Sequence, residues 1–360
     1  MAQTLKNFLA EAPLSPAARD VLLDAFDQGW HDPQKLTQGA SKARILQQNS
    51  LESIASRLGV HPTELEIVGE PALGHFFAIQ GFIEPTSTIF YSTVDKKEIQ
   101  AIARARQSAV ELSVNSLGQI NPDGFHGAKH DDLLALQGAN AETGVVQNLN
   151  EVTERFLSHA QRGLVCLDFT AVGCQQPLPE KWDGAVFDSR SWRGPQGLGI
   201  VAIKSGSRWR NPLPHINSVK TPQSFSLPLL ISSAVALESW VSDDERIRQL
   251  SRRLRDGIRS RISDCDIAGD LEGSLPHVNS FSFLYVEGEE LLRSLEKCGF
   301  LVDSGSACTA EDLQPSHVLA AMGLLTHGNV RITIHAETTE TDIDELIGAL
   351  IQSVEELRKL

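Results

Sequence analysis

One cysteine of this sequence lies in a segment suited to nucleophilic chemistry. Cys308 ends the run Ser304-Gly305-Ser306-Ala307-Cys308, and small polar residues of this kind favour an exposed loop where a thiol can meet a partner. A thiolate there is a candidate reactive group, and the alternative is an idle thiol. The other cysteines have apolar or helical neighbours, which favour buried positions: Cys166, Cys174, Cys265 and Cys298. Since no C-x-x-C pair is present, we expect free thiols and neither a zinc knuckle nor a redox dithiol.

Other polar residues have the types that bind ligands or metals. Asp168 stands at the end of an apolar run, where a carboxylate either contacts a ligand or caps a turn. His126 and His130 are spaced i, i+4 beside two aspartates. The residues before them are rich in glycine and polar side chains, which favours a solvated surface stretch over a metal site. We therefore expect no metal centre.

The pattern of apolar residues predicts the elements that position these side chains. Short apolar runs alternate with helical stretches, which favours an α/β unit with a mostly parallel sheet. The expected strands are residues 88–91, 109–114, 133–136, 164–169, 185–187 and 198–203. Residues 41–58 carry a largely apolar helical face that ends at Gly59. Residues 227–237 are the most apolar segment, far too short to span a bilayer, and predict a buried helix.

The pattern changes after residue 240. Residues 278–286 and 330–335 read as strands and 289–298 as a helix, and an amphipathic helix follows Thr339. Thr339 and Asp342 have the spacing of a capping box at the start of that helix. The chain is long enough for two domains. We predict a large α/β domain over residues 15–240 and a smaller C-terminal α+β domain over 241–360 that carries Cys308.

An ordered series of motifs resembles the cysteine desulfurases of the aminotransferase class V family. The series comprises Val302-Asp303-Ser304-Gly305-Ser306-Ala307-Cys308-Thr309, Gln314-Pro315-Ser316-His317-Val318-Leu319 and Val330-Arg331-Ile332-Thr333. Upstream, Glu142-x-Gly144-x-x-Gln147 and Gly194-Pro195-Gln196-Gly197 are similar to two further stretches of that family. The resemblance implies the fold-type-I architecture of enzymes that use pyridoxal phosphate (PLP). It also implies a homodimer or heterodimer with its sites near the subunit interface.

The resemblance assigns roles to three residues. In the family, a cysteine thiolate attacks the sulfur of PLP-bound cysteine and becomes a persulfide, and Cys308 is similar to that cysteine. Asp168 matches the carboxylate that pairs with the pyridine nitrogen of PLP. Ser191 stands where the family has the lysine that forms a Schiff base, and a serine cannot form that bond.

The segment that resembles the phosphate-binding turn of the family also differs. Residues 69–73 align with it, but Glu70 repels a phosphate and Pro71 lacks the N–H group that a helix N-terminus offers to an anion. Since the lysine and this turn are both altered, we expect that PLP has been lost and that the chain holds no cofactor.

Three functions remain open on this reading. The first is a cysteine desulfurase-like pseudoenzyme that binds or regulates a protein partner without PLP chemistry. The second is a PLP-independent sulfur relay through a Cys308 persulfide, and the third is an active PLP-dependent cysteine desulfurase. The expected partner is an active desulfurase or a sulfur acceptor. A formal charge of −14 argues against nucleic acid and anionic membranes. The N-terminal residues lack the basic and apolar regions of a signal peptide, so we expect a cytoplasmic protein.

Overall fold

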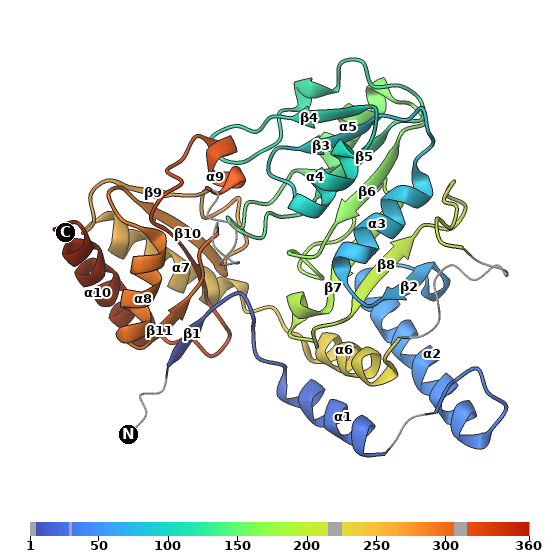
Figure 1. Ribbon diagram of the computed structural model, residues 1–360. Helices are drawn as coiled ribbons and strands as arrows, with labels where there is room; N and C mark the ends of the chain where they lie inside the picture. Colours follow the sequence, from blue (N-terminus) through green and yellow to red (C-terminus); the bar gives the residue numbers. More distant parts are fainter. Residues whose placement is uncertain (1–4, 29–30, 215–224, 306–314, 360) are drawn as a thin grey trace.

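The computed structural model describes residues 5–28, 31–214, 225–305 and 315–359. A seven-stranded sheet forms the larger unit, seen at the right of Figure 1. Its strands, in spatial order, are β2 (Leu65–Val68), β8 (Gly199–Ile203), β7 (Gly184–Asp188), β6 (Leu164–Asp168), β5 (Leu133–Gln137), β3 (Ile89–Ser92) and β4 (Ala109–Leu112). The strands from β7 to β4 are parallel, and β8 runs antiparallel to both of its neighbours. The predicted α/β class with a mostly parallel sheet is confirmed.

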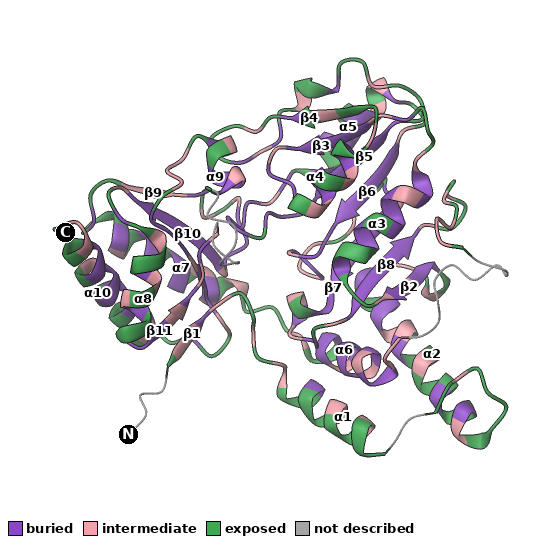
Figure 2. Ribbon diagram, in the orientation of Figure 1, coloured by how far each residue is buried: buried purple, intermediate pink, exposed green. Residues whose placement is uncertain are grey.

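Helices cover both faces of this sheet, which explains why its central strands are buried throughout (Figure 2). Alternate residues of each strand point to opposite faces. One face packs against α3 (Pro71–Phe82) and α4 (Lys97–Arg104). The other packs against α5 (Leu149–His159) and α6 (Leu227–Ser239), and α6 is covered in turn by α1 (Pro16–Asp27) and α2 (Gln38–Leu58). The apolar segment 227–237 is therefore a buried helix, as predicted.

A smaller unit is built on a second core. Its antiparallel sheet has the order β12 (Asn329–Thr333), β10 (Val278–Phe283), β9 (Cys265–Ile267). The helices α7 (Asp244–Arg259), α8 (Gly288–Lys297) and α10 (Glu340–Leu357) pack on it. The Thr339 hydroxyl accepts a hydrogen bond from the Asp342 backbone N–H, and the Asp342 carboxylate accepts one from the Thr339 backbone N–H, so the predicted capping box is confirmed. The remaining short elements are η1 (Pro62–Glu64), η2 (Pro122–Phe125), η3 (Ser189–Trp192) and α9 (His317–Met322).

The N-terminal strand belongs to the smaller unit. β1 (Lys6–Phe8) pairs in parallel with β11 (Phe300–Val302), and Phe8 is buried in the core of that unit. The sequence did not indicate this pairing, because a three-residue strand carries almost no periodic signal. The chain thus passes from the small unit into α1 of the large one (Figure 1). Among the described residues, no helix combines the length and hydropathy needed to cross a membrane.

Candidate functional site

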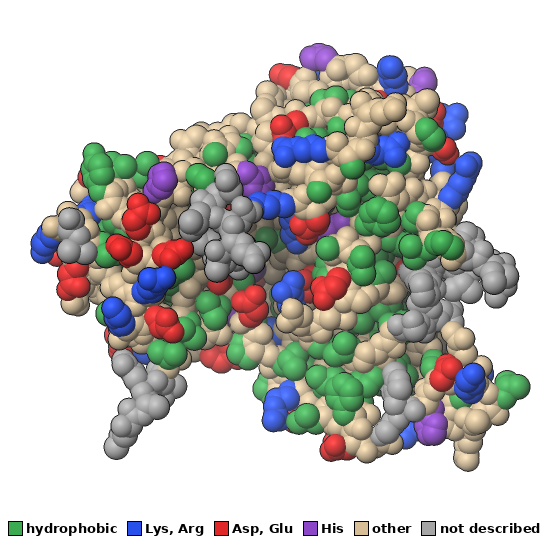
Figure 3. Space-filling view, in the orientation of Figure 1, with side chains coloured by type: hydrophobic (Ala, Val, Ile, Leu, Met, Phe, Trp, Pro, Cys, Tyr) green, Lys and Arg blue, Asp and Glu red, His purple; other side chains and the backbone are tan. Residues whose placement is uncertain are grey.

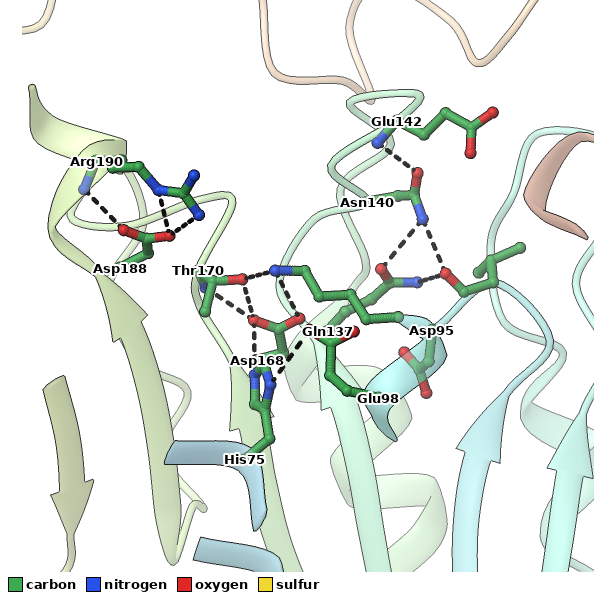
Figure 4. Close-up of polar contacts among 12 residues, drawn as sticks. His75, Asp95, Glu98, Gln137, Asn140, Glu142, Asp168, Thr170, Asp188 and Arg190 are labelled. Carbon is green, nitrogen blue, oxygen red and sulfur yellow. Dashed lines mark hydrogen bonds and ion pairs between the residues drawn. The ribbon is translucent and has the colours of Figure 1, made fainter. Parts of the chain in front are cut away.

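The carboxyl ends of the parallel strands bring several polar side chains to one edge of the large sheet. Gln137 ends β5, Asp168 ends β6 and Asp188 ends β7. An open parallel sheet commonly binds its ligands at this edge. A cavity of about 520 Å³ lies there, lined by residues of both units. Figure 4 shows Asp168 and Asp188 at neighbouring strand ends facing the same space.

Asp168 is a buried carboxylate with three neighbouring donors. Its Oδ1 accepts hydrogen bonds from the Thr170 backbone N–H at 2.9 Å and from Thr170 Oγ1 at 2.5 Å. His75 Nε2 lies 3.3 Å from Oδ1, and Lys96 Nζ lies 3.9 Å from Oδ2. Burial by itself would raise the pKa of Asp168, but the charges of Lys96 and His75 hold it well below its usual value. The carboxylate is therefore ionised at neutral pH.

His75 supports Asp168 from beneath the sheet edge. It comes from α3 and is 1% exposed. Its contact with Asp168 lacks good hydrogen-bond geometry, and its Nδ1 lies 3.9 Å from Glu98 Oε1. Figure 4 shows the imidazole pointing up at the carboxylate. A buried carboxylate flanked by a histidine on one side and an ammonium group on the other is a stable anionic partner for a cationic or N–H-bearing ligand.

Lys96 is a site residue that the sequence analysis missed. It precedes α4, lines the cavity, and donates a hydrogen bond from Nζ to Thr170 Oγ1. In the sequence it is one of two lysines at the polar start of a helix, which is an ordinary solvated position. The signal that could have found it is its place just after the carboxyl end of β3, because that end shares an edge with Asp168.

Ser191 lies on η3 and lines the cavity. Its hydroxyl donates to the Asp188 backbone oxygen at 2.7 Å. Asp188 and Arg190 of the same turn form a two-point pair, in which Arg190 Nε and Nη2 donate to Asp188 Oδ2 at 2.9 and 2.7 Å. Ser191 thus holds the turn through this hydrogen bond.

Arg190 offsets the negative charge at the altered phosphate-binding turn. Hydrogen bonds to Asp188 raise the pKa of Arg190, and the charges of Glu11 and Glu70 add to the effect. Glu70 is the residue that precedes α3, and no side-chain hydrogen bond caps that helix. Arg190 thus lies in the field of three carboxylates, and its guanidinium is a hydrogen-bond donor of the kind that residues 69–73 lack.

The smaller unit contributes an arginine, Arg331, to the cavity lining. Arg331 of β12 pairs with Asp303 at 2.7 Å, while its Nε is buried without a hydrogen-bond partner among the described residues. The cavity lining is mixed in charge, with the basic side chains of Lys96, Arg190, Arg193 and Arg331 and the acidic ones of Glu11, Asp188, Asp243 and Asp244. Its basic side chains can donate charge-assisted hydrogen bonds to an anionic group of a ligand.

The structure separates the cysteines. Cys308, the candidate persulfide carrier, lies outside the described residues. Cys166 is buried, as predicted, whereas Cys174, Cys265 and Cys298 are partly exposed. Burial raises the pKa of Cys174 to about 11 and that of Cys265 to about 12. These two thiols are therefore poor nucleophiles at neutral pH.

The described residues fit PLP in three respects. Asp168 offers an ionised carboxylate for a pyridine nitrogen, and Arg190 offers a guanidinium for a phosphate. Lys96 offers a primary amine inside the cavity, on a different element from the position where the family carries its lysine. The chain therefore has groups that suit the ring nitrogen, the phosphate and the aldehyde of PLP, although Ser191 and Glu70 differ from the family.

Comparisons with known proteins agree with the motifs. The model of the family Aminotransferase class-V matches residues 80–346. A cysteine desulfurase of Nostoc sp. is 33% identical over 265 residues, which are 69% of this chain and 65% of that protein, so the chain spans less than two thirds of this relative. The cysteine desulfurase IscS of Photorhabdus laumondii subsp. laumondii is 30% identical over 332 residues, covering 85% of this chain and 81% of the relative. A solved structure described as a NifS-like protein superposes with a TM-score of 0.87 and 21% identity, covering 99% of this chain and 100% of that one.

The prediction that the chain holds no cofactor is wrong. The matched family and the desulfurase relatives suggest PLP binding. The prediction took the changes at Ser191 and in residues 69–73 as evidence that the cofactor had been lost. With a match over most of its length and this identity to a cysteine desulfurase, the chain belongs to the aminotransferase class-V family.

Proposed function

We propose that this protein binds PLP in the cavity at the carboxyl edge of its large sheet and releases sulfur from cysteine for transfer to a protein partner. The observation that carries the proposal is the ionised, buried Asp168 beside a cavity whose lining includes Lys96, Arg190 and Arg331. Bound PLP supplies an electron sink that weakens bonds around the α-carbon of an amino acid. The names of the desulfurase relatives support cysteine as that amino acid.

The residues of this chain have separate tasks in the proposed reaction. Asp168 pairs with the ring nitrogen and keeps it protonated, and His75 keeps Asp168 ionised. Arg190 pairs with the phosphate, while Arg331, which lines the cavity from the smaller unit, binds the substrate carboxylate. Cys308 is the thiol that accepts the sulfur, because its segment resembles the persulfide-forming segment of the desulfurases.

A dimer completes the proposal. Large apolar side chains remain exposed on α1, on α2 and between them, namely Leu23, Phe26, Leu36, Ile45 and Leu46. Figure 3 shows apolar side chains gathered over the lower right of the molecule, where these helices lie. Exposed apolar side chains in one region indicate an interface with another protein chain. We expect a second copy of this chain or a related chain to cover them.

Equilibrium dialysis against PLP tests the proposal directly. The wild-type protein should bind PLP with a dissociation constant in the micromolar range, and Asp168→Asn should weaken binding by about tenfold or more, because the ring nitrogen loses an ionised partner. Asp123→Asn is the matched control, since Asp123 is an exposed carboxylate on η2 with a side chain 71% exposed. Failure of the wild-type protein to bind PLP would exclude the proposed function.

A regulatory role toward a partner is the second candidate, and Ser191 favours it. Its hydroxyl is held by the Asp188 backbone and cannot take the place of an amine in the reaction. Measuring alanine released from cysteine separates the two candidates. PLP-bound protein that forms alanine is a desulfurase, whereas PLP-bound protein that forms none, alone and with its partner chain, has the regulatory role.

A further inference from the structure

We infer that Lys96 replaces the lysine missing at position 191 and forms the covalent bond to PLP. The inference rests on the proposed PLP binding and names the residue that anchors the group. The family resemblance places the PLP-binding lysine on the turn after β7, whereas Lys96 lies at the N-terminus of α4.

The position of Lys96 is the first argument. It is the one lysine among the described residues that line the cavity. Its Nζ contacts both Thr170 and Asp168 at the end of β6. The side chain is 28% exposed, so its amine is accessible from the cavity without being surrounded by bulk water.

Lys204, the next lysine in the sequence after Ser191, is excluded by the register of the sheet. Lys204 follows β8, whose last residue Ile203 pairs with Gly184 at the start of β7. Asp188, at the cavity end of β7, pairs instead with Gly199. Lys204 is therefore at the opposite edge of the sheet, where its ammonium lies 5.2 Å from the centre of the Trp182 ring.

The contacts of Lys96 are compatible with an amine that forms a C=N bond to the aldehyde of PLP. Its ammonium group first loses one proton to water, and the neutral amine then attacks the aldehyde carbon of PLP. The aldehyde oxygen leaves as water with the two remaining amine hydrogens, so a C=N bond forms and no oxidant is needed. Nζ has a hydrogen bond to Thr170 and an ionic contact with Asp168. The flexible lysine side chain can leave both partners by rotation of its side-chain bonds.

Asp168 serves two partners in turn in this scheme. Before the bond forms, it neutralises the Lys96 ammonium. Afterwards the nitrogen of Lys96 belongs to the C=N bond, and the carboxylate is available for the pyridine nitrogen. His75 stays beside Asp168 throughout, so the buried carboxylate keeps a polar neighbour in both states.

Borohydride reduction followed by peptide mapping tests the inference without an activity assay. Protein loaded with PLP is reduced, digested and sequenced by tandem mass spectrometry. We expect the phosphopyridoxyl group on Lys96, and its loss in Lys96→Arg and Lys96→Ala. Lys96→Arg keeps a cation beside Asp168 and so preserves the fold. Lys97→Arg is the matched control, because Lys97 is the adjacent but exposed lysine of the same helix.

The outcomes separate this inference from the proposed function. If dialysis shows PLP bound while the group maps to another lysine, or no lysine is modified, the inference is wrong and the proposed function stands. If the wild-type protein binds no PLP, both are wrong. The inference and the proposed function are both supported if Lys96 is labelled in wild type and in Lys97→Arg. Lys96→Arg should then lack the absorbance band of the PLP-bound protein.

Discussion

The imidazole of His75 lies 3.3 Å from the carboxylate of Asp168, and both side chains are almost completely buried. His75 is the third residue after Ala72 on α3, whereas Asp168 ends a strand at the centre of the sheet. Their pairing keeps a negative charge inside the protein near the cavity that Lys96 lines. It links the helix that resembles a phosphate-binding element to the residue that resembles the ring-nitrogen partner.

Removing His75 should destabilise the protein through Asp168. His75→Leu keeps the volume but removes the polar neighbour, and we expect the free energy of unfolding to fall by about 1–3 kcal/mol in urea denaturation near neutral pH. In an Asp168→Asn background the same change should cost clearly less, since the charge that His75 stabilises is absent. Equal costs in the two backgrounds would show that His75 acts by packing alone.

Asp95 should make the stability fall as the pH rises. Burial raises its pKa from 3.8 to about 8, the charge of Asp168 adds to this, and only the Ser92 backbone N–H opposes it. Between these two values the folded state keeps a proton that the unfolded state has lost, so unfolding becomes easier with rising pH. Asp95→Asn removes this dependence, and its stabilising effect should be about 1–3 kcal/mol larger at about pH 8 than at about pH 5.

Urea denaturation at the two pH values measures this difference. Asp123→Asn, an exposed carboxylate change, should show no such difference. An Asp95→Asn variant whose stability relative to wild type is the same at both pH values would contradict the proposed protonation of Asp95.

Arg190 should recognise the phosphate of PLP. Arg190→Gln removes the guanidinium beside Glu70, so we expect PLP to bind about tenfold more weakly. Pyridoxal, which lacks the phosphate, should bind wild type and variant equally in the same dialysis. Arg210→Gln, at a side chain 82% exposed, is the control and should leave both ligands unaffected. If Arg190→Gln weakens the binding of PLP and of pyridoxal equally, Arg190 does not recognise the phosphate. It then acts by holding the turn through its ion pair with Asp188.

Cys308 should be the residue that carries sulfur. After incubation with cysteine, or with cysteine and an active desulfurase, we expect a persulfide on Cys308 ahead of the other cysteines, detected by mass spectrometry. Cys174 and Cys265 should stay unmodified near neutral pH because burial raises their pKa values to about 11 and about 12. Cys308→Ser should abolish transfer to an acceptor while Cys298→Ser keeps it. A persulfide that forms first on Cys298 would exclude the Cys308 carrier.

The sequence by itself determined the elements with strong local signals. β5 and β6 are continuous apolar runs, and α10 begins at a capping box and carries a long apolar face. These features depend on residues close together in the chain, so their periodicity and spacing are readable directly. The same holds for the motifs around Gly194 and Cys308, which resemble those of the cysteine desulfurases.

Only the tertiary structure decided which side chains share the site. Lys96 and Thr170 are 74 positions apart and meet because β3 and β6 end at the same edge of a parallel sheet, with β5 between them. His75 reaches Asp168 because α3 packs under that edge, and β1 joins β11 across almost the whole chain. Contacts of this kind arise from strand order and packing, to which no local pattern of residues is sensitive. For that reason the sequence showed a lysine missing at position 191, whereas only the fold placed the amine of Lys96 beside Asp168.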